Sequence, residues 1–83
     1  MVQRTDATLS MTREELSGYL RRLADELEGE GNVTVPVDNR KVQLHPSDSI
    51  TCDVEVVERS SRLRSDRETV SIEMRWKPRR EGT

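Results

Sequence analysis

Two segments in the C-terminal half of the chain alternate apolar and polar residues with a period of two. They span residues 49–59 and 68–76. The alternating apolar positions of these two segments are Ile50, Cys52, Val54 and Val56, then Val70, Ile72, Met74 and Trp76. Such alternation predicts two β-strands, each with one apolar face. The loop 60–66 would join them as an antiparallel hairpin.

The register of this predicted hairpin is constrained by its apolar faces. Both faces point the same way only if the numbers of paired residues sum to an even value, so an odd sum is excluded. A sum of 126 places Val54 opposite Ile72 and Asp53 beside Glu73, whereas a sum of 128 places Asp53 beside Arg75. Because opposite charges stabilise a cross-strand pair, we favour 128.

A helix is predicted over residues 12–28. Its apolar positions recur with a period of 3.6. They are Leu16, Tyr19, Leu20, Leu23, Ala24 and Leu27. Thr12 and Glu15 have the spacing of a capping box at the N-terminus. At the other end, Gly29 or Gly31 would terminate the helix by adopting a positive φ.

Three shorter strands complete the predicted secondary structure. Alternation indicates strands over residues 7–11, 33–37 and 41–44, with a turn between the last two. Pro36 cannot donate a hydrogen bond to a neighbouring strand, so its strand should lie at a sheet edge or contain a bulge there.

Together these elements predict the order β-α-β-β-β-β. The fold class is α+β, with two layers: one amphipathic helix packed on an antiparallel sheet. We expect one small domain over residues 1–83, with an ordered core at about 7–77.

The composition limits how much of this domain can be buried. Of the 83 residues 31% are apolar, 36% are charged and none is Phe. Because backbone ordering costs about 1–2 kcal/mol per residue, so small a core leaves a thin margin of stability. Self-association or a protein partner would relieve this shortage. We therefore expect a small non-enzymatic interaction or structural module that forms a homo-oligomer.

Residue types that support catalysis are scarce. Cys52 lies on an apolar strand face, which favours a packing role, and His45 precedes Pro46 in a predicted turn, where solvent would surround it. One His and one Cys cannot form a closed zinc site, and no Gly-rich phosphate loop is present. We expect no catalytic residue, cofactor or bound metal.

The location of the protein is predicted from segments that the sequence lacks. The N-terminal residues contain no signal-peptide-like apolar stretch, and no segment has the length and apolarity to cross a membrane. The only cysteine cannot form an internal disulfide. We therefore expect a cytoplasmic protein without membrane contact.

Charge is unevenly distributed along the chain. Residues 1–58 contain 6 basic and 12 acidic side chains, whereas residues 59–80 contain 8 basic and 3 acidic ones. Arginine clusters like that of the hairpin loop 59–67 can neutralise phosphates. The alternative function is therefore weak nucleic-acid binding through this loop, with Arg62, Arg64 and Arg67 as the contact residues. No exposed aromatic side chain accompanies them to stack on bases.

Trp76 has two interpretations. By alternation it faces inward at the end of the last strand, where it would fill the core and contact Leu16, Tyr19 or Leu20. A strand-end position can also leave an indole half exposed, as in an interface anchor.

The chain resembles the amphi-Trp domain family, small haloarchaeal and bacterial proteins. The resemblance rests on the helix with Tyr19, Leu20, Leu23 and Ala24, and on the closing strand ending at Trp76. It covers roughly residues 7–77. The Arg-rich loop 59–67 is longer and more basic than the family pattern. The resemblance implies a small cytoplasmic α+β module, and it transfers no activity.

Overall fold

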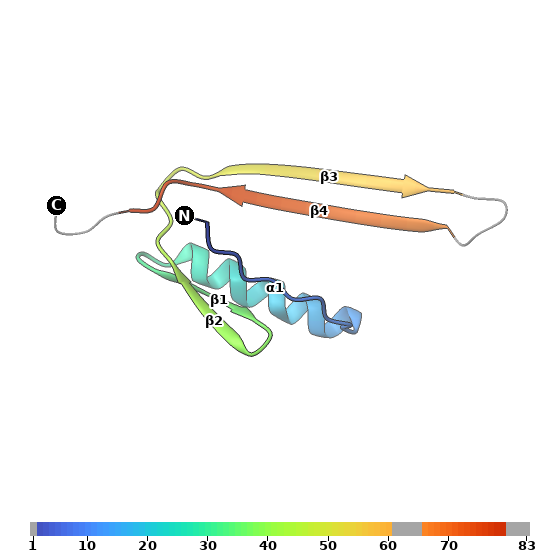
Figure 1. Cartoon of the computed structure of the whole chain (residues 1–83), viewed down its shortest axis with the longest axis horizontal. Coiled ribbons are helices and arrows are strands. Elements are labelled where there is room, and N and C mark those ends of the chain that lie inside the picture. Colours follow the sequence, from blue (N-terminus) through green and yellow to red (C-terminus); the bar gives the residue numbers. More distant parts are fainter. Residues whose placement is uncertain (1, 61–65, 80–83) are drawn as a thin grey trace. The chain divides into compact units, whose positions relative to one another are not determined.

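The computed structural model of the protein describes residues 2–60 and 66–79 (Figure 1). One helix and four strands lie within these ranges. In chain order they are α1 (Arg13–Glu28), β1 (Val33–Val37), β2 (Arg40–Leu44), β3 (Thr51–Arg59) and β4 (Arg67–Arg75). They fall into two compact units, one of residues 2–46 with 78–79 and one of residues 47–60 with 66–77. The α+β class is confirmed, and the expectation of one domain over 1–83 stays a prediction.

The N-terminus of α1 is fixed by the predicted capping box. The Thr12 backbone N–H donates to Glu15 Oε1 at 2.9 Å, and the Glu15 N–H donates to Thr12 Oγ1 at 3.1 Å. These two bonds satisfy backbone donors that have no partner within the helix. At the C-terminus the cap residue Gly29 is extended, with φ −71°. The positive φ lies two residues further on, at Gly31, with φ 108°.

The β1–β2 hairpin follows the helix and pairs Val33 with Leu44 and Val37 with Arg40. β2 thus begins one residue before the predicted strand. The reversal takes place at Asp38, whose φ of 55° lies in the left-handed region. Aspartate tolerates this conformation better than most residues because its short polar side chain can hydrogen-bond to the nearby backbone.

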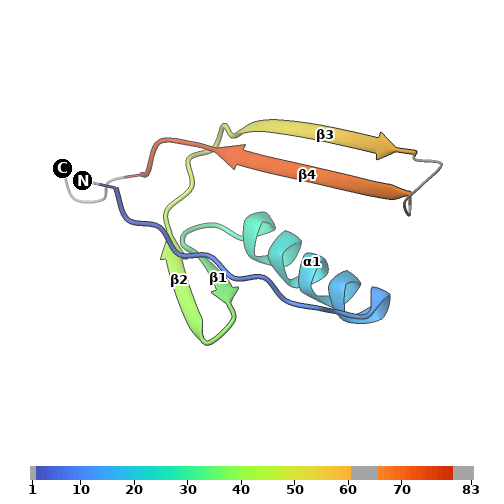
Figure 2. The same ribbon diagram turned by 45° about the vertical axis from the view of Figure 1, so that its right-hand side comes forward.

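The helix packs against β1, as Figures 1 and 2 both show. The Tyr19 hydroxyl donates to the Pro36 carbonyl oxygen at 2.9 Å, and the Thr34 N–H donates to Glu26 Oε1 at 2.8 Å. Val33 is 1% exposed and forms the apolar core of the described residues. The first unit is therefore a helix laid on a short hairpin, with very little buried side-chain volume.

The predicted leading strand over residues 7–11 is wrong. The structure assigns no strand to these residues, and Leu9 and Met11 are 50% and 38% exposed. A strand must pair with a neighbouring strand, and β1 pairs only with β2. The order of the described elements is therefore α-β-β-β-β. The alternation of apolar and polar residues before the helix therefore does not lead to sheet pairing.

The four strands form two separate two-stranded sheets, β1–β2 and β3–β4. The β3–β4 pair is a long antiparallel ribbon in which Thr51 faces Arg75 and Arg59 faces Arg67 (Figure 1). Both apolar sets lie on one face, as the alternation predicts.

The register favoured from the sequence, with a sum of 128, is wrong. Paired residue numbers sum to 126, so Val54 faces Ile72 and Asp53 faces Glu73. The Asp53–Arg75 ion pair on which the choice of 128 rested is nevertheless present, with Arg75 Nη2 2.8 Å from Asp53 Oδ2. A long arginine side chain reaches the diagonal cross-strand neighbour, so the ion pair does not require direct opposition.

Candidate interaction surface

The hairpin of β3 and β4 presents a continuous set of apolar side chains, which we call the apolar face. Its members are Cys52, Val54, Val56, Val70, Ile72 and Met74. The register makes three direct cross-strand pairs of them, Cys52 with Met74, Val54 with Ile72 and Val56 with Val70. β-Branched residues suit such pairs because their stiff side chains pack well on a pleated surface.

Within the second unit, no side chain covers the apolar face. Val54, Val56, Val70 and Ile72 are between 56% and 65% exposed. None of the described residues of the second unit is buried. An isolated two-stranded hairpin is at best marginally stable in water, and a third strand or a covering element normally completes it. Among the described residues, this face is therefore the surface whose burial by a binding partner would stabilise the chain most.

The opposite face of the hairpin is polar, and its charges pair like with like. Asp53 lies opposite Glu73, and Arg59 lies opposite Arg67. Arg75 neutralises the acidic pair, because its guanidinium binds Asp53 at 2.8 Å and Glu73 at 3.0 Å. The acidic end of the polar face lies near the start of β3, and the basic end lies at the hairpin loop.

A third like-charge pair lies on the same side as the apolar face. Glu58 stands opposite Glu68 at the loop end of the hairpin. Charges directly opposite each other with the same sign destabilise a two-stranded sheet. Both ends of the hairpin thus carry charge arrangements that its own pairing does not favour.

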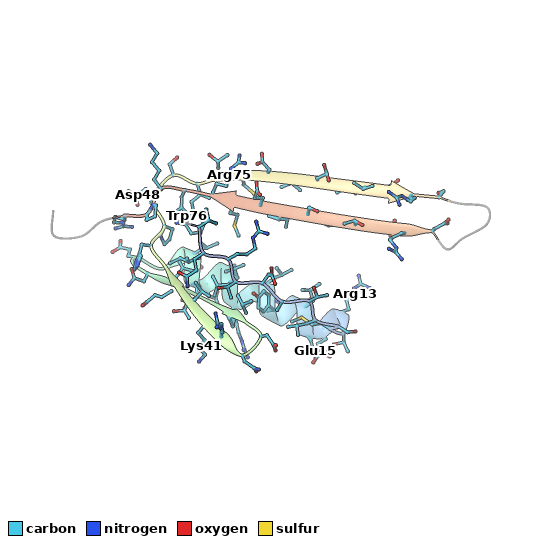
Figure 3. All side chains as sticks on the ribbon, viewed as in Figure 1. Arg13, Glu15, Lys41, Asp48, Arg75 and Trp76 are labelled. Carbon is cyan, nitrogen blue, oxygen red and sulfur yellow. The ribbon has the colours of Figure 1, made fainter. Side chains whose placement is uncertain are left out.

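Trp76 follows β4 directly (Figure 3). Its side chain is half-buried. With it, a shallow hollow is lined by Ser47, Ser49, Thr51, Arg75 and Lys77. A partly exposed indole is typical of a residue that anchors an interface. Both interpretations of Trp76, the core contact with Leu16, Tyr19 or Leu20 and the interface anchor, stay predictions.

The other residues singled out from sequence have varied outcomes. Arg62 and Arg64 lie outside the described residues. Arg67 begins β4 and is exposed, directly opposite Arg59. Arg59 was not predicted as a contact residue, although the correct register would have placed it beside Arg67.

Cys52 and His45 are both exposed. Cys52 occupies the expected strand face but is not packed, because nothing in its own unit covers that face. Within its own unit Cys52 therefore does not have the predicted packing role. His45 Nδ1 lies 2.6 Å from Asn32 Oδ1, which fits the expected loop residue. Within residues 2–60 and 66–79, no cluster of three or more His, Cys, Asp or Glu side chains is placed to hold a metal ion.

These features define a class: a small α+β protein in which a helix-and-hairpin unit is followed by a long hairpin with an open apolar face. The chain belongs to the Amphi-Trp domain family, whose model matches residues 3–83. The match covers essentially the whole chain and confirms the resemblance. No curated protein and no solved structure matches the chain. In the part of the chain that the structure describes, no helix is both long enough and apolar enough to cross a membrane.

Proposed function

We propose that this chain is a non-enzymatic interaction module that associates with a second copy of itself through the β3–β4 hairpin. The observation that carries the proposal is the exposure of four apolar side chains, Val54, Val56, Val70 and Ile72, on one face of a two-stranded sheet. Removing such surface from water contributes roughly 25 cal/mol per Å² of apolar area.

The small core of the first unit supports the same proposal. Val33 is the one apolar side chain among the described residues that is fully buried. A protein with so little internal burial gains much from an interface that buries further apolar area. The exposed thiol of Cys52 has no second cysteine to pair with, which suits a reducing compartment. A cytoplasmic location is part of this proposal.

The test compares the same substitution on the two faces of β3. Val56 lies on the apolar face and its neighbour Val57 lies on the polar face. In sedimentation equilibrium at micromolar concentration, we expect the unaltered chain and Val57→Lys to associate and Val56→Lys to be monomeric. A lysine at position 56 would bring an ammonium group into the interface, where its desolvation is unfavourable.

Protection of the Cys52 thiol gives a second readout. Cys52 belongs to the apolar face, so its reaction with a maleimide should slow as the protein concentration rises through the association range. A monomer with a freely reactive Cys52 would overturn the proposal. A monomer with a protected Cys52 would also overturn it, because the face would then be covered within one chain.

The second candidate function is weak nucleic-acid binding at the loop end of the hairpin. The observation that favours it is the direct opposition of Arg59 and Arg67, both exposed. Binding of a labelled DNA duplex should weaken as salt rises, with a log–log slope of about −0.9 per phosphate contact. Changing Arg62, Arg64 and Arg67 together to Ser should abolish it. Unchanged binding by that variant would remove this candidate.

A further inference from the structure

The outer edges of the β3–β4 hairpin offer an attachment point that is distinct from its apolar face. β3 and β4 hydrogen-bond only to each other, so each strand has one edge whose backbone N–H and C=O groups lack a strand partner in the described chain. Long open edges of this kind pair readily with another strand. The charges along β3 indicate which strand fits.

We infer that two copies of the chain pair antiparallel along β3, with Val56 of each copy at the two-fold axis. This inference rests on the proposed self-association and adds a second contact, along the strand edge, to the contact that the apolar face makes. In this register Asp53 of one copy faces Arg59 of the second copy, and the reciprocal pair forms as well. Two cross-strand ion pairs of opposite sign result.

The charge pattern makes the antiparallel arrangement complementary. Inside each hairpin Arg59 faces Arg67, and Asp53 faces Glu73, so each strand carries a basic end and an acidic end in matching positions. A second copy running in the opposite direction brings acidic ends to basic ends. Pairing between the two copies therefore places opposite charges side by side, whereas pairing within one hairpin places like charges side by side.

The other two-fold registers of β3 are less favourable. Centring the axis on Glu55 sets that carboxylate against its own copy, and centring it on Val54 sets Asp53 against Glu55 twice. An axis at Val57 avoids like charges but shortens the paired stretch to residues 55–59. The axis at Val56 keeps residues 53–59 paired, so it forms more backbone hydrogen bonds without any like-charge pair.

The apolar faces stay aligned in this arrangement. Two-fold antiparallel pairing joins residues whose numbers sum to an even value, so even-numbered residues meet even-numbered residues. The four strands then share one continuous apolar face. We choose β3 over β4 because the paired stretch of β3 contains three apolar side chains, all valine, whereas the equivalent stretch of β4 contains two, Val70 and Ile72. An exposed edge strand pairs with another chain more readily when it is more apolar.

A charge-swap experiment on the full chain tests the inference. Asp53→Arg alone would place arginine against Arg59 of the second copy twice, and Arg59→Glu alone would place glutamate against Asp53 twice. Each variant should self-associate at least about tenfold more weakly than the unaltered chain. Mixed one to one, the two variants form both pairs with opposite signs, so native mass spectrometry should show a heterodimer in excess of either homodimer.

The two variants also keep the hairpin itself intact. Asp53→Arg puts a cation opposite Glu73, and Arg59→Glu puts a carboxylate opposite Arg67, so each removes a like-charge pair within one chain. Asp53→Arg also removes the exposed ion pair with Arg75, and the new pair with Glu73 offsets this loss. Loss of association would therefore not reflect loss of folding, which circular dichroism checks. The matched control is the pair Glu73→Arg and Arg67→Glu on β4, which should associate like the unaltered chain, alone or mixed.

The outcomes separate this inference from the proposed function. If the unaltered chain is monomeric, the proposed function fails and the inference fails with it. If the unaltered chain associates and Val56→Lys does not, but the mixed β3 variants show no preference for the heterodimer, the edge pairing is overturned and association through the apolar face stands. A heterodimer preference confined to the β4 variants would also overturn the choice of β3.

Discussion

Asp53 and Glu73 lie directly opposite each other in the β3–β4 sheet, and Arg75 binds both. Replacing Arg75 with Gln should leave two facing carboxylates without their cation. All three side chains are more than half exposed, so the expected loss of hairpin stability is only about 0.5–1 kcal/mol. Urea unfolding of the full chain, at a concentration where both proteins are monomeric, measures it.

A double-mutant cycle identifies the cause of this loss. In the background Asp53→Asn, one of the two facing charges is absent, so Arg75→Gln should cost less than it does in the unaltered chain. An equal cost in both backgrounds would mean that the cross-strand ion pair with Asp53 contributes nothing and that Arg75 acts through its ion pair with Glu73 or through its aliphatic stem.

The hydroxyl of Tyr19 connects α1 to β1. Tyr19→Phe removes its hydrogen bond to the Pro36 carbonyl oxygen, and we expect a loss of about 0.5–1.5 kcal/mol in the free energy of unfolding. Thermal unfolding followed by circular dichroism at the helix band measures the change. Ser17→Ala removes an exposed hydroxyl from the same helix and should cause no such loss. A Tyr19→Phe protein as stable as the unaltered chain would show that water replaces the bond without cost.

Glu15 makes the helix cap sensitive to acid. Hydrogen bonds from the Thr12 backbone N–H and from the Thr12 side chain hold the pKa of the Glu15 carboxyl below its ordinary value of 4.5. A carboxyl with a lowered pKa in the folded state stabilises that state fully above its unfolded pKa, and this contribution is lost as the pH falls through the lower folded value. Helicity of α1 should therefore decline as the pH falls below about 4.5.

The variant Glu15→Gln separates this carboxyl from the other acids. Glutamine can still accept the Thr12 backbone hydrogen bond in a capping box, but it does not titrate. The acid-induced decline in helical circular dichroism should be smaller in this variant than in the unaltered chain. Identical pH profiles for the two proteins would show that other carboxyls cause the decline.

Trp76 reports on association because it is the only tryptophan in the sequence and is half-buried. If it anchors an interface, its emission should shift to shorter wavelength as the concentration rises through the association range, and Trp76→Ala should stay folded but associate more weakly. If it fills the core against Leu16, Tyr19 or Leu20, its emission should not depend on concentration. In that case Trp76→Ala should cost about 3–5 kcal/mol and unfold a domain of such thin margin.

Emission typical of fully hydrated indole at every concentration would contradict both interpretations of Trp76. The residue would then be an ordinary strand-end side chain. Substituting Lys77, which lines the same shallow hollow, with Ala provides the control, because it removes a neighbouring side chain and leaves the indole in place.

The local elements of this protein follow from its sequence. The Thr12 and Glu15 spacing determines where α1 begins, because a capping box needs only residues three apart in the chain. The two-residue period of β3 and β4 determines which side chains share a face, because successive residues of a strand point to opposite sides. Family membership follows in the same way from the helix and the closing strand.

The tertiary structure decides what local patterns leave open. Residues 7–11 alternate like a strand, but a strand forms only by pairing with a neighbour, and β1 and β2 pair only with each other. Registers 126 and 128 both align the apolar faces, so the apolar pattern cannot choose between them. The ion pair of Arg75 with Asp53 does not choose either, because Arg75 reaches Asp53 as a diagonal neighbour in register 126. The alternation in β3 and β4 likewise does not predict that the apolar face is uncovered. A period of two determines which side chains share a face, but not what packs against that face.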